Sequence, residues 1–169
     1  MFSMPAQPTP EDLSNLASEV SEAVTPAVQN LAGAAEPLLQ AQAEADGWST
    51  PQAGWIVKLA MQPLMQSVAN GTPGPEALDA AYHAARRRLT ISYFEDAITR
   101  GKRPFEAFLT VIDLEKQVAE RAGRAAPAYP DALLKHACEV VEGASRRGDT
   151  AEAQVEIGYS ILRGAPTPD

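Results

Sequence analysis

Apolar residues recur at steps of three and four along most of this chain, the spacing that places them on one face of an α-helix. The clearest stripe comprises Leu78, Tyr82, Ala85, Leu89 and Tyr93. Strand-like alternation is almost absent, because the one β-branched and aromatic run, residues 89–94, lies inside this helical pattern. The pattern therefore predicts an all-α fold.

Prolines mark most of the predicted helix starts. Proline suits the first helical position because its missing amide hydrogen would have no partner there, and a preceding Thr, Ser or Asp can cap the free amides. Predicted starts fall near residues 10, 26, 51, 75, 104, 130 and 149. They indicate an irregular bundle of about six to seven helices. A stack of helical repeats is the alternative, but the segments share no signature beyond the proline.

The first third of the chain carries an apolar stripe with alternating steps of four and three. Its larger members are Leu13, Val20, Val24, Leu31 and Leu38, with alanines between them. This heptad-like seam is interrupted by Pro26 and Pro37, each of which is expected to kink or break a helix. Two interpretations stay open: two or three short helices that pack weakly on the body, or an amphipathic arm that docks on a partner or a neighbouring copy.

Charge separates the same segment from the rest. The chain has a net charge of −8, and residues 1–57 contain seven Asp and Glu residues and no Lys or Arg. With the turn at Gly47, this asymmetry predicts an acidic helical arm at 1–47, a helical bundle at 48–164 and a flexible tail at 165–169. A membrane-surface role is disfavoured because anionic lipids repel such an arm.

The composition favours a cytoplasmic protein, or part of a particle assembled in the cytoplasm. No apolar run reaches the roughly 20 residues that span a bilayer, and the first residues do not resemble a secretory signal. The single cysteine, Cys138, agrees with a reducing compartment. The excess of Arg over Lys, with many Ala and Pro residues, suggests a bacterial or phage genome.

No catalytic, metal or cofactor signature is present in the sequence. His83 and His136 each lack the carboxylate three residues upstream that a bundle di-iron site uses. On a helix, Cys138 would face away from His136, so the two would not form a nucleophile and base pair. Glycines occur singly and form no phosphate-binding loop. We therefore expect no catalytic, cofactor or metal site and a non-enzymatic protein; the alternative is an enzyme whose acid-base site is assembled from residues far apart in the sequence.

Two tryptophans and a group of basic residues are the remaining features. Trp55 is expected in the core, and Trp48, in a Gly-Trp-Ser turn, is the candidate exposed anchor or a cover over the core edge. The basic residues are Arg86, Arg87, Arg88, Arg100, Lys102 and Arg103. They are expected either to pair with acids of neighbouring helices or of the arm, or to contact nucleic acid or an acidic partner.

These features favour a structural or adaptor protein that docks helices onto a protein partner or onto copies of itself. Roles of this kind include assembly chaperones and connector or accessory subunits of a larger particle. The alternative is a small helical nucleic-acid-binding or regulatory protein that uses the two basic clusters.

Overall fold

The computed structural model describes residues 9–164, and within the first helix it does not place the side chains of residues 12, 13 and 16–29. The predicted tail at 165–169 lies outside the described residues. Over this range the fold is all-α, as predicted, with six helices and no strand. They are α1 (Pro10–Ala45), α2 (Thr50–Ala69), α3 (Gly74–Thr99), α4 (Pro104–Arg121), α5 (Asp131–Arg146) and α6 (Ala151–Leu162).

Local capping explains where the helices of the body begin. Before α2, the Ser49 hydroxyl accepts a hydrogen bond from the Gln52 amide at 3.4 Å, and the Gln52 side chain accepts one from the Ser49 amide at 2.9 Å. The Thr150 hydroxyl accepts a hydrogen bond from the Ala153 amide at 3.2 Å and caps α6. These starts lie within two residues of those predicted from the sequence.

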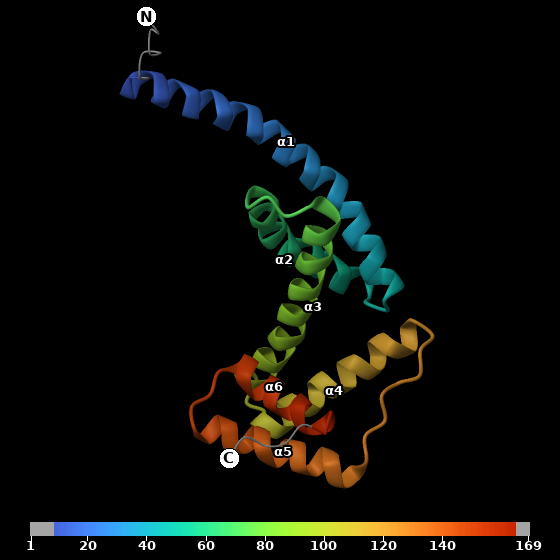
Figure 1. Ribbon diagram of the computed structural model, residues 1–169. Helices are drawn as coiled ribbons and strands as arrows, with labels where there is room; N and C mark the ends of the chain where they lie inside the picture. The colour runs from blue at the N-terminus through green and yellow to red at the C-terminus, as the bar shows by residue number, and fades with distance from the viewer. Residues whose placement is uncertain (1–8, 165–169) are drawn as a thin grey trace, which may run out of the picture.

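Helix α1 differs from the prediction because it runs without interruption through Pro26 and Pro37. The expected break into shorter helices is therefore wrong. A proline removes one intrahelical hydrogen bond and bends a helix, but the turns on both sides can continue it. The resulting helix of 36 residues curves along its length, and its N-terminal part extends away from the other helices (Figure 1).

Two hydrophobic clusters form the core. The first joins the last turns of α1 to α2 and to the N-terminal part of α3, and the second joins the end of α3 to α5 and α6. Helix α4 contributes Leu114 and Val118 to the first cluster and Phe108 and Val111 to the second. Helices α3 and α4 thus connect an upper and a lower part of the molecule (Figure 1).

Two glycines permit close approaches that hold these parts together. Gly47 has a φ of 102°, and a Cβ there would lie 1.9 Å from the backbone oxygen of Val118. Gly158 lets α6 lie against α4 and α5, because a Cβ there would lie 2.5 Å from Phe108 and 2.8 Å from Val141. A larger residue at either position would require the helices to move apart.

Candidate functional site

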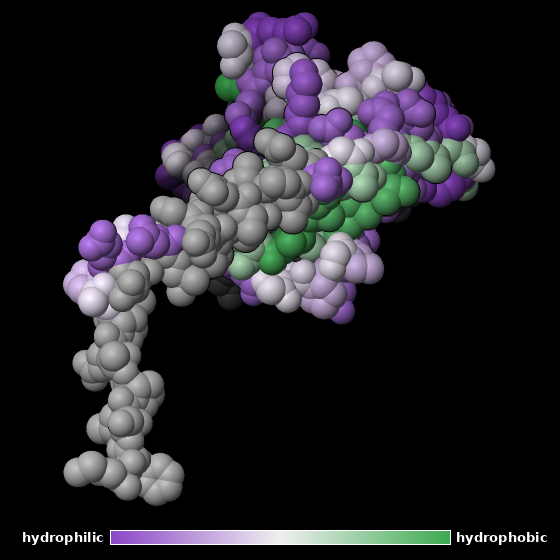
Figure 2. All heavy atoms as spheres, turned by 90° about the horizontal axis from the view of Figure 1, so that it is seen from above, coloured by the Kyte–Doolittle hydropathy of each residue, from purple (hydrophilic) through white to green (hydrophobic). Residues whose placement is uncertain are grey.

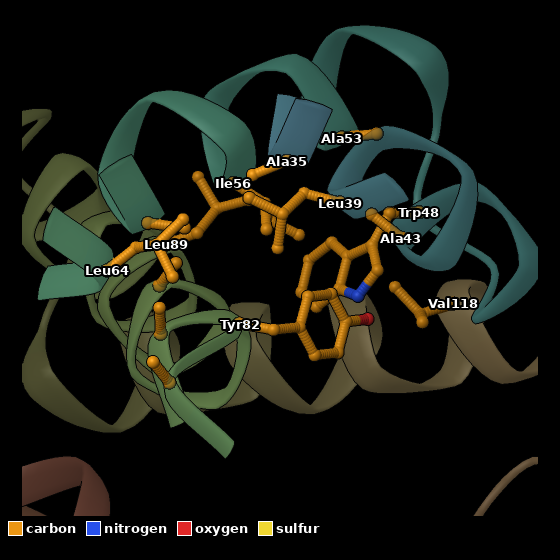
Figure 3. Close-up of a cluster of buried hydrophobic side chains, with 14 of the residues drawn as sticks. Ala35, Leu39, Ala43, Trp48, Ala53, Ile56, Leu64, Tyr82, Leu89 and Val118 are labelled. Atoms are coloured by element: carbon orange, nitrogen blue, oxygen red, sulfur yellow. The ribbon is translucent and has the colours of Figure 1, made fainter. Parts of the chain in front are cut away.

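Helix α1 carries two neighbouring apolar stripes, and among its described side chains the fully buried ones belong to a single stripe. Ala35, Leu39 and Ala43 are at most 4% exposed and lie in the first hydrophobic cluster (Figure 3). Leu38, on the predicted seam, is 59% exposed. The seam and the packing stripe lie about 80° apart around the helix, given 3.6 residues per turn. The body therefore holds α1 by a stripe beside the predicted seam.

The predicted docking residues are placed only in part. Leu31 is half-buried and Leu38 is exposed, whereas the side chains of Leu13, Val20 and Val24 lie outside the description. Leu38 on α1 and Trp55 and Met65 on α2 are three of the four large apolar side chains that the described surface exposes. Figure 2 views the molecule from above, onto the end where α1 and α2 lie, and shows a band of hydrophobic surface flanked by hydrophilic residues.

Of the two alternatives for Trp48, its 6% exposure excludes the exposed anchor and agrees with a cover over the core edge. Trp55 is 56% exposed, so the expectation that it lies in the core is wrong. The buried stripe of α2 passes through Ala53 and Ile56, and Trp55 lies about 100° away from Ile56 around the helix. Trp55 carries Lys58 over its ring, with the Lys58 Nζ atom 4.8 Å from the ring centroid.

Trp48 belongs to a junction that fastens the α1–α2 turn to α3 and α4. Figure 3 shows its indole beside the buried Tyr82 side chain. The Tyr82 hydroxyl donates a short hydrogen bond to Asp46, and burial, followed by this bond, raises the pKa of Tyr82. Arg124 donates to the Asp46 carbonyl at 3.0 Å, and Arg121 to the Gly47 carbonyl at 3.4 Å.

The three consecutive arginines of α3 diverge, as the helix geometry requires. Arg87 pairs with Glu152, at 2.8 Å, and with Glu156, both on α6. Arg88 pairs with Glu95 on its own helix at 2.6 Å, and this bond raises the pKa of Arg88. Of the three, only Arg86 has no carboxylate partner among the described residues. Its guanidinium carbon lies 5.9 Å from the centroid of the Tyr82 ring.

The second basic cluster lies at the far end of α3, roughly 20 Å from Arg87 at 1.5 Å per helical residue. Arg100 pairs with Asp96 at 2.9 Å, and Lys102 donates to the Thr110 hydroxyl at 3.4 Å. Arg103 lies 3.8 Å from Glu142 and occupies the N-cap position of α4, where its backbone amide donates to the Glu106 carboxylate at 2.8 Å. The structure therefore does not bring the two predicted basic clusters together into one patch.

A cleft of about 920 Å³ opens between α3, α4, α6 and the segment that joins α4 to α5. Apolar side chains of three helices form part of its wall, among them Ile91, Leu114 and Val155. Four arginines also line it: Arg86, Arg87, Arg124 and Arg163. Arg86, Arg124 and Arg163 make no ion pair with any described carboxylate, and we call this lined space the arginine cleft.

The acids of the arginine cleft are already engaged. Asp46 accepts from Tyr82, and Glu156 pairs with Arg87. Glu115 accepts from the Tyr159 hydroxyl at 2.8 Å and from the Tyr129 hydroxyl at 3.2 Å. Burial, followed by the charge of Glu115, raises the pKa of both tyrosines. In the cleft, Glu156 is therefore ion-paired, and Asp46 and Glu115 accept from tyrosine hydroxyls and form no ion pair with a described cation.

The histidines and the cysteine are exposed or half-buried and do not converge. His83 lies 3.3 Å from Asp79 on the surface of α3, and burial raises the pKa of the Cys138 thiol. No three His, Cys, Asp or Glu side chains of the described part of the chain are arranged to hold a metal ion. Within the same part, no helix combines the length and the apolar character that a membrane span needs.

Sequence reasoning missed Arg124, Arg163, Glu115 and Tyr159 as members of one site. They come from α4, from the segment after it and from the end of α6, and no local motif links positions so far apart in the sequence. The sequence could have shown only that each is polar beside an apolar helical face.

No protein-family model matches the chain, and no curated protein or solved structure matches it significantly. Similarity to known proteins therefore assigns this chain no function.

Proposed function

We propose that this protein is a non-enzymatic adaptor or structural subunit that docks on a protein partner, or on further copies of itself, through helix α1. The proposal extends to its place of action, the cytoplasm or a particle assembled there. Assembly chaperones and connector or accessory subunits are roles of this kind.

One observation carries the proposal. Helix α1 is attached to the body by Ala35, Leu39 and Ala43, while Leu38 of the adjacent seam stays 59% exposed. Two apolar stripes on one helix are more than attachment to the body requires. The seam continues in sequence toward residue 13, along the part of α1 that projects from the body (Figure 1). An apolar seam on a projecting helix is a common means of recognition between proteins.

The nucleic-acid-binding alternative has less support. Arg87, Arg88, Arg100 and Arg103 already have carboxylate partners, and the two basic clusters lie apart. Phosphate contacts would have to replace these ion pairs. Salt separates the two functions, because phosphate binding weakens steeply as salt rises, whereas apolar docking depends on it far less.

Affinity capture from the native source, with and without nuclease, tests the proposal. The bait is the full chain, compared with a chain lacking residues 1–30, which keeps every residue of α1 found in the core. We expect a stoichiometric protein, or a second copy, to remain after nuclease treatment and to be lost with residues 1–30. Circular dichroism should show a folded body in the shortened chain.

A pair of point variants makes this test specific for the seam. Leu38→Gln should weaken capture, whereas Glu36→Gln, at an exposed position about 160° away around α1, should leave it unchanged. Equal capture by the full chain, the shortened chain and both variants would refute docking through α1. Partners that disappear with nuclease would favour the nucleic-acid alternative.

A further inference from the structure

The apolar seam of α1 reads the same in both directions between residues 13 and 31. Its members over this stretch are, in order, Leu13, Ala17, Val20, Val24, Ala27 and Leu31. In an antiparallel pair of such helices centred on residue 22, every member lies opposite a residue of its own type: Leu13 opposite Leu31, Ala17 opposite Ala27, and Val20 opposite Val24. A twofold interface needs this property, because the same surface of both copies must fit itself. The seam is therefore complementary to a second copy of itself.

The acids of the projecting part of α1 lie away from this seam. They are Glu11, Asp12, Glu19 and Glu22, and residues 10–30 contain no Lys or Arg. At about 100° per residue, each of these acids lies roughly 100° or more around the helix from the centre of the seam. The face that carries the seam is thus uncharged. A partner of opposite charge would form no ion pairs on this face, and a second copy would meet no like charge at close range.

The body leaves room for antiparallel pairing. The described residues that attach α1 to the body begin at Ala35, and the helix before them extends away from the other helices (Figure 1). In a pair centred on residue 22, residue 35 of one copy lies level with residue 9 of the other, just before α1 begins. The two bodies then lie at opposite ends of a paired segment about 27 Å long, at 1.5 Å per residue. A parallel pair would instead bring both bodies to the same end.

We propose that two copies of this protein pair antiparallel through residues 13–31 of α1, with a twofold axis near residue 22. This inference rests on the proposed function and names a second copy as the partner. The pairing covers the seam of both copies and leaves the acids on the outer surface of the pair. Because the two segments carry charge of the same sign, salt that screens their repulsion should strengthen the pairing. Leu38 lies beyond the paired segment.

Charged substitutions in the full chain test the pairing by analytical ultracentrifugation. The seam variant V20E/V24E places carboxylates at the centre of the paired surface, and the matched control S18E/Q29E adds the same charge on the opposite side of α1. We expect the native chain to self-associate, and more strongly at high salt. At high salt the control should associate within about threefold of the native chain. The seam variant should associate at least about a hundredfold more weakly, because its carboxylates would be buried between the helices.

Cysteine cross-linking tests the direction of the pairing. In chains that carry Cys138→Ser, the Ala17→Cys and Ala27→Cys variants are prepared separately and mixed with oxidised glutathione. Residue 17 of one copy meets residue 27 of the other only in the antiparallel pair, because a parallel pair keeps these positions about 15 Å apart. We expect the mixture to form a disulfide between copies at least about tenfold faster than either variant alone, because a disulfide needs closely spaced residues. Faster cross-linking of each variant with itself, or equal loss of association in S18E/Q29E and V20E/V24E, would overturn the proposal.

The outcome for the proposed function is separate. A native chain that remains monomeric at the highest attainable concentration overturns the pairing of two copies. The proposed adaptor function then still stands if capture of a different protein depends on residues 1–30 and on Leu38. It fails only if that capture is independent of α1.

Discussion

Helices α1 and α3 are the two longest helices of the protein, and they are held in different ways. Helix α3 has 26 residues and buries eight of them on several faces, and seven of the eight belong to the two hydrophobic clusters. Helix α1 has 36 residues, and those of its described side chains that lie in the core are Ala35, Leu39 and Ala43, near its end. Packing in both clusters holds α3, whereas the described core contacts of α1 are confined to its last three turns. A helix held in this way has surface to spare for a partner.

The largest expected effect is on α3. Phe94 is 1% exposed and lies in the second cluster, so Phe94→Ala removes a ring from a packed core. We expect a loss of about 3–5 kcal/mol in the free energy of unfolding, measured by urea denaturation followed by circular dichroism. Because α3 and α4 pass through both clusters, the transition should remain single. A second transition would show that the clusters unfold independently.

A smaller effect is expected where α1 meets the body. Leu39→Ala should lower the free energy of unfolding by about 2–4 kcal/mol, because Leu39 is fully buried in the first cluster. Leu38→Ala, one position away, should change it by less than about 0.5 kcal/mol, because Leu38 is 59% exposed. The same urea titration measures both variants. Equal losses would contradict the assignment of the two stripes.

The smallest effect concerns the body at high pH. The pKa of Tyr159 is raised in the folded protein, so above its ordinary value near 10 the unfolded chain releases a proton that the folded chain keeps. The free energy of unfolding should therefore be unaffected by Tyr159 below pH 10 and should decrease above it. Tyr159 should account for up to about 1.4 kcal/mol of this decrease per pH unit. Tyr159→Phe should flatten this decline. The test is urea denaturation of both proteins between pH 9 and about 11, a range in which lysine titration affects them equally. If the free energy of unfolding fell with pH at the same slope in both, the prediction would be wrong.

Local chemistry made most of the fold predictable. Caps such as Ser49 and Thr150 and the reversal at Gly47 act within a few residues, so the sequence alone indicates where the body helices begin and that the fold is all-α. The charge of the first third is likewise a property of composition. The break expected at Pro26 and Pro37 was wrong because a proline weakens a helix locally, while the turns on either side decide whether it continues.

The sites were less predictable because they depend on which face of each helix meets a neighbour. One residue turns a helix by about 100°, so Leu38 and Leu39, equally apolar in sequence, have opposite environments. Trp55 is exposed for the same reason, because it lies one residue before the buried Ile56. The arginine cleft, with Glu115 and Arg163 brought from separate helices, exists only once α3, α4 and α6 are packed. The sequence by itself determined the helices and the acidic arm. Only tertiary packing decided that Leu38 of α1 stays exposed and which arginines form no ion pair with a described carboxylate. The reason is that burial is set by contacts between segments far apart in the chain.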